Sequence, residues 1–311
     1  MTRHARVHTV PLPARERRSC ELSSRPPTRE LRGSVICYRG YRLRGLPRRR
    51  LELPDGVVTV LLQFSGTVRT GSPSAEHGSL VAGLRRTAVL AEHGAHLEGV
   101  EIILYPLAAY TIFGLPMHEL TDTVVRLTDL LGPRAQRWLD RLVCCPSWES
   151  RFALIDRLLV WRLRSGPPHR PEVGFAWRAL HRSAGAAPVE NLVSELGWSR
   201  RRLERWFDQQ VGLPPKTLAR VLRLQRALRL AESDISWAEV AATAGYHDQP
   251  HFDHVFKAMV GCSPSQFRLA RRRGRHPRAL DRIPHQVTSV EISGIDAFLQ
   301  AAPAIGRQAA G

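Results

Sequence analysis

The chain has 311 residues, 43% of them hydrophobic, and a formal net charge of +18. This length favours two domains with tails, and the hydrophobic fraction is sufficient for globular cores. No run of about eighteen apolar residues occurs, which excludes a membrane-spanning helix. The five cysteines include no C-x-x-C pair, which argues against a disulfide framework and a zinc ribbon and favours a cytoplasmic location.

The positive charge is concentrated in two parts of the chain. Residues 1–50 contain 14 arginines and 3 acidic residues, and residues 171–275 contain 17 basic and 10 acidic residues. A local excess of this kind indicates a polyanionic partner. The basic, proline-rich composition of residues 1–32 predicts a disordered arm.

The next part, residues 33–164, is predicted to be a β-rich sensor or dimerisation domain with a helical extension. Short β-branched segments bounded by glycine, such as "GVVTVLLQFSG" and "GVEIILYPLAAYTIFG", predict a small antiparallel β domain over residues 33–114. After Met117 the apolar period changes to about 3.6, which predicts helices in "ELTDTVVRLTDLLG", in "RAQRWLDRLVCC" and, beginning at Ser147, in "SWESRFALIDRLLVWRLRSG". The proline-rich residues 165–171 are predicted to be a linker.

Residues 172–273 are predicted to be all-helical and to contain one arrangement twice. In the first copy a short helix, "PVENLVSE", leads through a glycine turn into a second helix, "SRRRLERWFDQQVG". A long helix follows. In the second copy a short helix, "SWAEVAATAG", leads through another turn into the helix "QPHFDHVFKAMVG". Apolar residues four apart, Leu203 with Phe207 and Phe252 with Phe256, are expected in the core. The pattern predicts a double helix-turn-helix domain, an α+β protein overall, and a flexible tail over residues 274–311.

Three histidines in "AGYHDQPHFDHVF" raise the alternative of a metal site. His247 and His251 are four apart, as in a zinc-protease helix. Pro250 lies between them, and proline is tolerated only in the first turn of a helix, so the helix is expected to begin at Asp248 or Gln249 with Asp248 as N-cap. His247 then lies outside the helix. We therefore expect no metal and no cofactor here, and interpret the histidines as DNA-facing.

Residues 172–271 resemble the C-terminal DNA-binding domain of the AraC/XylS family of bacterial transcription regulators. The resemblance is carried by "GWSRRRLERWF", "VGLPPKTLARVLRLQRA", "AEVAATAGYHDQPHFDHVF" and "GCSPSQFR". Residues 33–164, with "GLPMHEL" and the helices after it, resemble the sensor half of members of this family.

The resemblance implies which side chains face DNA. On the first reading helix these are Ser199, Arg200, Arg201, Arg202, Glu204 and Arg205, with Arg200 and Arg202 at phosphates; on the second they are Gln249, His251, Asp253 and His254. Arginine can bind guanine in a bidentate fashion, glutamine adenine, and glutamate the cytosine amine. Asp253 is repelled by phosphate, so the second unit either adds little affinity or binds more strongly once His254 is protonated.

The resulting interpretation is a transcription regulator, not an enzyme, that reads two successive major-groove segments of double-stranded DNA under the control of a small ligand at the N-terminal domain. RNA polymerase and a second copy of the chain are further partners that the resemblance allows, and no membrane is expected. Two alternatives stay open. One is nonspecific nucleic-acid binding through the Arg-rich arm. The other is a metal- or thiol-dependent enzyme in residues 33–164, where His93 and His96 lie near Glu92 and Glu98.

Overall fold

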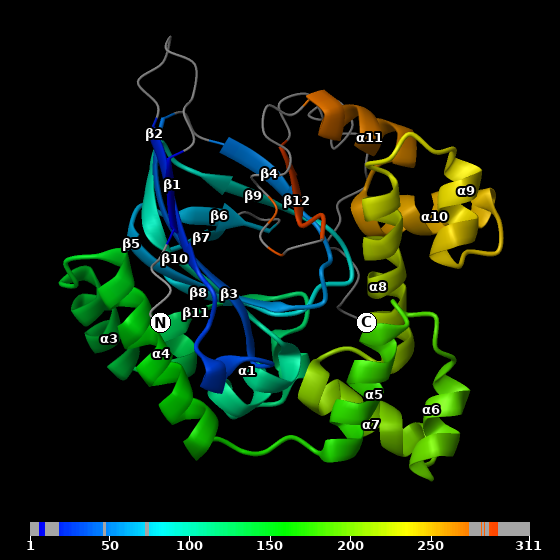
Figure 1. Cartoon of the computed structure of the whole chain (residues 1–311), viewed down its shortest axis with the longest axis horizontal. Helices are drawn as coiled ribbons and strands as arrows, with labels where there is room; N and C mark the ends of the chain where they lie inside the picture. Colours follow the sequence, from blue (N-terminus) through cyan, green and yellow to red (C-terminus); the bar gives the residue numbers. More distant parts are fainter. Residues whose placement is uncertain are drawn as a thin grey trace.

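The computed structural model describes residues 6–9, 19–45, 48–71, 75–273, 281, 283 and 286–291. Within these ranges, an N-terminal domain of two antiparallel β-sheets, four α-helices and two short 3-10 helices is followed by a helical domain, α5 to α11 (Figure 1). The α+β class expected from the sequence is confirmed. The two domains share one continuous apolar core.

Two sheets form the centre of the N-terminal domain. The seven-stranded sheet has, in spatial order, β1 (Arg6–Thr9), β2 (Ser19–Arg25), β3 (Val35–Arg44), β10 (His96–Leu104), β5 (Val58–Ser65), β8 (Leu80–Ala82) and β11 (Val124–Arg126). The five-stranded sheet has β12 (Ser289–Glu291), β4 (Arg48–Glu52), β9 (Val89–His93), β6 (Val68–Thr70) and β7 (Ala75–His77). Tyr41 and Leu97 of the first sheet pack against Val68 of the second, which joins the two sheets.

The strands of the larger sheet are held in register by their buried residues. In the central pairing, Ile102 of β10 lies opposite Tyr38 of β3 and Val60 of β5, and all three are buried. A one-residue slip would turn these side chains to the other face of the sheet, so their burial fixes the register.

Helices of the N-terminal domain lie beside the larger sheet. They are α1 (Pro106–Phe113), the short 3-10 helices η1 (Arg29–Leu31) and η2 (Met117–Leu120), α2 (Leu127–Leu131), α3 (Arg134–Val143) and α4 (Trp148–Ser165). Ser147 caps α4 by accepting a hydrogen bond from the Ser150 amide, as expected. A Cβ on Gly40 of β3 would lie 2.5 Å from the Trp148 ring, so α4 requires glycine there to approach the sheet this closely.

Two predicted elements in this domain are wrong. The segment read as a strand as far as Gly114 leaves the sheet after Leu104, and Pro106 begins α1 at a position where its missing N–H costs nothing. The helix predicted over residues 119–132 is split, because Val124–Arg126 pairs with β8 instead. Asp122 takes the left-handed conformation with φ +56° and breaks the helical path.

The arm predicted over residues 1–32 is also wrong in its second half. Ser19–Arg25 forms β2 and pairs with β3, and Leu31 is completely buried. Arg25 forms ion pairs with Glu149 at 2.8 Å and with Asp156 on α4. The Arg25 charge is therefore paired inside the fold, while residues 1–5 and 10–18 lie outside the described part.

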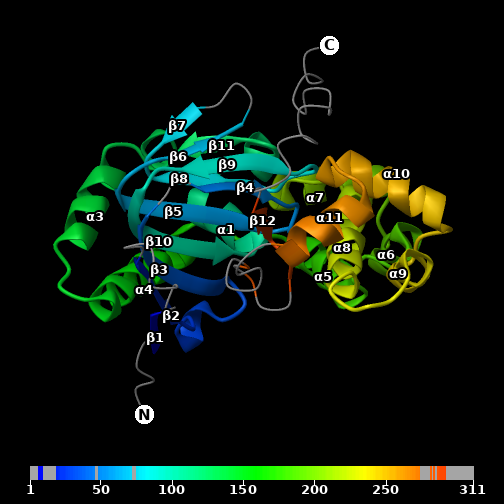
Figure 2. The ribbon, with the colours of Figure 1, turned by 90° about the horizontal axis from the view of Figure 1, so that it is seen from above.

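The helical domain contains seven helices within residues 171–273, in agreement with the all-helical pattern of this segment. They are α5 (Pro171–Arg182), α6 (Val189–Leu196), α7 (Arg200–Val211), α8 (Pro215–Leu230), α9 (Trp237–Ala244), α10 (Gln249–Val260) and α11 (Pro264–Arg273). Residues 166–170 connect α4 to α5, close to the predicted linker. Figure 2 shows these helices on one side of the β-sheets and α3 on the opposite side.

Part of the predicted flexible tail is ordered. Ser289–Glu291 forms β12, which pairs with β4 of the N-terminal domain, and Val290 is 1% exposed. Arg271 of α11 donates to the Ser289 carbonyl at 2.9 Å and forms an ion pair with Glu232. The chain thus returns from the helical domain to the β-sheets, where β12 completes the smaller sheet. Of the other tail residues, the structure describes only 281, 283 and 286–288. None of the described helices has the length and apolarity that crossing a membrane requires.

Candidate nucleic-acid interface

The first helix-turn-helix unit is built by α6, a tight turn and α7. Gly197 ends α6 in the left-handed conformation with φ +61°, which glycine adopts without strain. Ser199 then caps α7, its hydroxyl accepting a hydrogen bond from the Arg202 amide at 3.2 Å. Gly212 ends α7 in the left-handed region with φ +97°. Because its hydroxyl is engaged in the cap, Ser199 serves first to fix where α7 begins.

The two faces of α7 differ sharply. Leu203 and Phe207 are completely buried, as expected for core residues. Arg200, Arg201, Arg202 and Arg205 are exposed, and Glu204 is half-buried. The structure therefore brings all the predicted charged residues of this helix together in its N-terminal half.

Two of these predicted contact residues pair with each other. The Arg200 Nε donates to Glu204 at 2.9 Å, and an Arg200 Nη lies 3.3 Å from Glu190 of α6. The hydrogen bond to Glu204 raises the pKa of Arg200. Water screens exposed pairs of this kind, so the pair can open at low cost if DNA offers a better partner.

The other arginines of α7 have different surroundings. The Arg202 guanidinium lies 4.5 Å from the centre of the Trp198 ring, and that of Arg205 lies 5.3 Å from the Trp206 ring. Arg201 has no acidic partner among the described residues. The stacking of Arg202 on Trp198 was missed by the sequence reading, although the tryptophan two residues before the first helical position was a visible signal.

The second unit repeats this construction with α9 and α10. Ser236 and Glu239 form a capping box at the start of α9, and Gly245 ends it with φ +82°. Asp248 caps α10 by accepting a hydrogen bond from the His251 amide at 2.7 Å. Phe252 and Phe256 are completely buried, as predicted.

The histidines in this unit do not share a helical face. His247 lies before α10, its Nδ1 2.8 Å from an Asp248 carboxylate oxygen, whereas His251 is in the first turn of the helix. The expected start of α10 at Gln249, with Asp248 as its cap, is therefore confirmed. Within the described residues, histidine, cysteine and acidic side chains form no cluster of three or more that could hold a metal ion.

The predicted contact residues of α10 are less uniform in exposure. His251 and His254 are exposed, while Gln249 and Asp253 are half-buried. The His251 ring packs edge-on against Tyr246, with 5.8 Å between ring centres. The pKa of Asp248 is lowered, first by the His251 amide and then by His247, so the cap stays ionised near neutral pH. All four predicted residues lie in the first half of α10.

Helix α8 sets the separation of the two units. It has 16 residues, which corresponds to about 24 Å at 1.5 Å per residue. Figure 1 shows α6 and α7 near one end of α8, and α9 and α10 near the other. Nine of its residues are buried, so it is packed along its length rather than acting as a free tether.

The N-terminal domain contacts both second helices at their C-terminal ends, which the sequence did not predict. The Thr121 hydroxyl donates to the Gly212 carbonyl at the end of α7, and the Ala88 amide donates to the Met259 carbonyl near the end of α10 at 2.7 Å. Between them, Gln225 of α8 donates to the Pro54 carbonyl at 2.6 Å. Both predicted reading surfaces lie at the opposite ends of their helices and stay uncovered by these contacts.

Comparison with known proteins gives a match to the C-terminal part. Residues 192–288 match a family model described as a helix-turn-helix domain. The chain is 37% identical over 81 residues to the HTH-type transcriptional regulator MtrA of Neisseria gonorrhoeae, covering 26% of this chain and 27% of that protein. It is 34% identical over 98 residues to the HTH-type transcriptional activator RhaS of Escherichia fergusonii, covering 31% and 35%. These matches span about a third or less of each relative.

Among solved structures, ToxT of Vibrio cholerae O395 aligns over 75% of this chain and 96% of its own, with 12% identity and a TM-score of 0.41. The matched sequence covers both helix-turn-helix units almost completely, from within α6 to beyond α11. The C-terminal domain of this chain is therefore a helix-turn-helix domain of the AraC/XylS type.

Proposed function

We propose that the chain is a sequence-specific DNA-binding transcription regulator whose two helix-turn-helix units read successive major-groove segments. The observation that supports this most is the repeated construction of α7 and α10. Each is capped at its first turn, buries at least one phenylalanine on one face, and presents polar residues in its first half. Second helices of this motif contact base edges with their N-terminal residues.

In this proposal the side chains have distinct roles. Arg201 and Arg205 read guanine, and Gln249 reads adenine, each by paired hydrogen bonds. Arg202, positioned by its stacking on Trp198, contacts phosphate and contributes affinity that decreases with salt concentration. His251 and His254 offer ring nitrogens for hydrogen bonds to DNA beside Asp253.

The proposal also includes control by the N-terminal domain. Contacts at Thr121, Gln225 and Ala88 link that domain to α7, α8 and α10 in turn. The loops that carry Thr121 and Ala88 are joined to each other, since Asp122 accepts a hydrogen bond from the Arg86 amide at 2.8 Å. A ligand that shifts these loops would change how the two reading helices are presented to DNA.

Two alternatives receive less support from the structure. Nonspecific binding through residues 1–50 requires free arginines, but Arg39 forms an ion pair with Glu101 at 2.9 Å and Arg42 with Glu98 at 3.0 Å. A metal-dependent enzyme would use Glu92 and Glu98, yet Glu92 lies 3.0 Å from Arg69. The carboxylates that would hold a cation are thus already neutralised.

Selection of random duplex DNA by the full-length chain, at near-physiological salt, tests the proposal. Enrichment of two sequence blocks about one helical turn apart is the expected result. Salt-sensitive binding without enrichment would contradict sequence-specific reading and favour the Arg-rich arm. A chain with alanine in place of Arg3, Arg15, Arg17 and Arg18 serves as a control for that arm.

A further inference from the structure

A surface groove between α3 and α4 brings two thiols and two guanidinium groups together. Its volume is about 420 Å³, within the range of about 300–1,000 Å³ that is usual for small-molecule sites. Helix α3 and the residues after it contribute Asp140, Arg141, Cys144 and Cys145, and α4 contributes Arg157. The DNA-binding role uses none of these side chains, because the predicted reading surfaces lie on α7 and α10.

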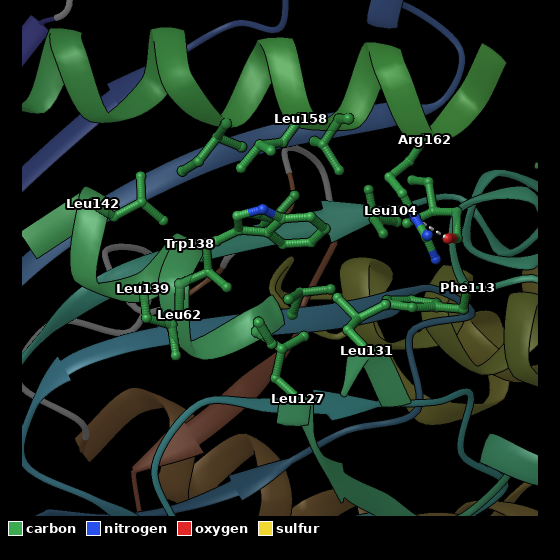
Figure 3. A pocket seen from close by; sticks show the side chains of 16 residues that line it. Leu62, Leu104, Phe113, Leu127, Leu131, Trp138, Leu139, Leu142, Leu158 and Arg162 are labelled. Atoms are coloured by element: carbon green, nitrogen blue, oxygen red, sulfur yellow. Dashed lines mark hydrogen bonds between the residues drawn. The ribbon is translucent and has the colours of Figure 1, made fainter. Parts of the chain in front are cut away.

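The walls of this groove are held in place by apolar packing on the inner faces of both helices. Leu142 of α3 and Leu158 of α4 point toward the larger sheet, and the Trp138 indole lies between α4 and the strands (Figure 3). Leu154, which also lines the groove, is 6% exposed and belongs to the same core. The groove is therefore formed before any ligand binds.

The two cysteines in the groove differ in accessibility. Cys144 is the C-cap residue of α3 and is exposed, whereas Cys145 is half-buried and its thiol donates to the Arg141 carbonyl at 3.3 Å. Of the cysteines whose side chains the structure describes, Cys144 is the one that is exposed. Burial raises the pKa of Cys262 to about 11, which disfavours the reactive thiolate there. Cys144 is therefore the thiol that an external reagent can reach.

The charges in the groove favour an anionic ligand. Arg141 and Arg157 are exposed and have no acidic partner among the described residues. Asp140 is the one carboxylate among the lining residues that the structure describes, and it accepts a hydrogen bond from the Gln136 side-chain amide at 2.9 Å. Guanidinium groups bind carboxylates through two parallel hydrogen bonds and repel metal cations. The thiols are therefore better placed to meet an anion than a metal ion.

We propose that this groove is a modification site, at which Cys144 forms a mixed disulfide with a low-molecular-weight disulfide whose halves carry carboxylates. The Cys144 thiolate attacks one sulfur of that disulfide, so that a new S–S bond forms and the original one breaks. The other half leaves as a thiolate and takes up the proton that Cys144 lost. Cys144 is oxidised and the leaving half is reduced, so no other oxidant is needed.

The retained half of the disulfide fits the charges around Cys144. Its carboxylates lie at Arg141 and Arg157, and an amino-acid end places its ammonium group at Asp140. Glutathione, with two carboxylates and one ammonium group, carries this set of charges. The site does not depend on the DNA-binding role of α7 and α10.

The neighbouring thiol does not readily remove this adduct. Release would require a disulfide between Cys144 and Cys145, but consecutive Cα atoms are about 3.8 Å apart and disulfides usually join Cα atoms about 4.4–6.8 Å apart. The hydrogen bond from Cys145 to the Arg141 carbonyl also holds its thiol away from that reaction. The mixed disulfide is therefore the expected product.

Reaction of the full-length chain with glutathione disulfide tests the site, and the neutral 2-hydroxyethyl disulfide serves as the comparison. Intact-mass measurement and peptide mapping follow the adduct over time. The first glutathione is expected on Cys144, to be retained in Cys145→Ser and lost in Cys144→Ser. Arg141→Gln combined with Arg157→Gln is expected to slow the glutathione reaction by about ten-fold, because attraction of the anion is lost. The rate with the neutral disulfide is expected to stay nearly unchanged.

Arg134→Gln combined with Arg137→Gln is the matched control, because both arginines are exposed on α3 and do not line the groove. This pair removes the same charge and is expected to leave both rates nearly unchanged. First modification at another cysteine would overturn the site. So would an unaltered glutathione rate in the groove variant, equal slowing by the two arginine pairs, or equal slowing with the charged and the neutral disulfide.

Discussion

Arg200 and Arg201 are neighbours on α7 with different electrostatic surroundings. Arg200 is engaged by Glu204 and Glu190, whereas Arg201 is exposed with no acidic partner among the described residues. An arginine that must break ion pairs gains less from a new partner than one that is free. Arg201 is therefore expected to contribute more to DNA recognition than Arg200.

Substitution of Arg201 by alanine is expected to weaken binding to the selected site by about 1–3 kcal/mol and to relax preference at one base position. Arg200→Ala is expected to have a smaller effect that is similar for all sequences. Fluorescence anisotropy on a set of single-base variants of the site measures both. Arg157→Ala, an exposed position on α4, is the control. Equal losses for Arg201 and Arg157 would refute a base-reading role for Arg201.

His93 gives the folded protein a pH dependence. Burial, followed by Arg50, lowers its pKa to about 4. An unfolded histidine has a pKa near 6.5, so the unfolded chain binds more protons between these values, and stability is lost as pH falls through this window. The loss from His93 is about 2 kcal/mol at pH 5 relative to pH 8.

Urea unfolding at pH 5 and pH 8 measures this loss. His93→Gln removes the titrating group and is expected to show a smaller difference between the two pH values by about 2 kcal/mol. His96→Gln, an exposed position three residues along, is expected to behave as the original chain. A pH difference unaltered in His93→Gln would show that this histidine is not the cause.

Single residues with a strong local rule were predictable from the sequence. Ser199 and Asp248 cap their helices because a short polar side chain before a helical period satisfies free amide groups. The burial of His93 in β9 was not predictable from the sequence. Its burial depends on strands far apart in the sequence. The DNA roles of the four α10 residues stay predictions.

The C-cap position of α7 both ends the helix and contacts the N-terminal domain. Gly212 ends the helix with φ +97°, and a Cβ there would lie 2.9 Å from the Met117 carbonyl of the N-terminal domain. Gly197 ends α6 with φ +61°, but a Cβ there would meet no atom within 4 Å. Both glycines have positive φ, and only Gly212 also lies at a contact between the domains.

Gly212→Ala is expected to destabilise the chain more than Gly197→Ala. Both substitutions carry the cost of a left-handed alanine, about 1–2 kcal/mol, and only the first disturbs the contact with Met117. Chemical unfolding of both variants measures the difference. Equal destabilisation would mean that the α7 end does not depend on its contact with η2.

Gln225 of α8 joins three segments. It is 1% exposed and donates to the carbonyls of Pro54 and Val287 at 2.6 and 3.1 Å. Gln225→Leu leaves both buried carbonyls without this donor, and a cost of about 1–3 kcal/mol in the free energy of unfolding is expected. Gln209→Leu, at a half-buried position, is the control. An equal effect at both positions would contradict the role of Gln225 as a link.

Helices of the C-terminal domain were predicted better than the strands. A 3.6 period with serine or aspartate before it and glycine after it is a local signal, and α7, α9 and α10 carry all three. Strand pairing is not local. Val124–Arg126 looks helical by period but pairs with β8, and Ser289–Glu291 joins β4 from the other end of the chain.

In the whole molecule, the N-terminal domain supports both helix-turn-helix units. The sequence predicted two domains and a linker but not that their cores are continuous or that β12 crosses between them. Such contacts depend on three-dimensional positions that neither composition nor periodicity encodes. Their consequence is that α7 and α10 are held at a separation set by α8, rather than by a flexible tether.

This fixed separation is tested most directly by changing the DNA between the two selected sequence blocks. Inserting about five base pairs turns one block by half a helical turn relative to the other. If α7 and α10 read both blocks as one rigid unit, the full-length chain is expected to lose at least ten-fold in affinity, measured by fluorescence anisotropy. Unchanged affinity would mean that the units bind independently or that only one reads DNA, and would contradict the structure-based mechanism.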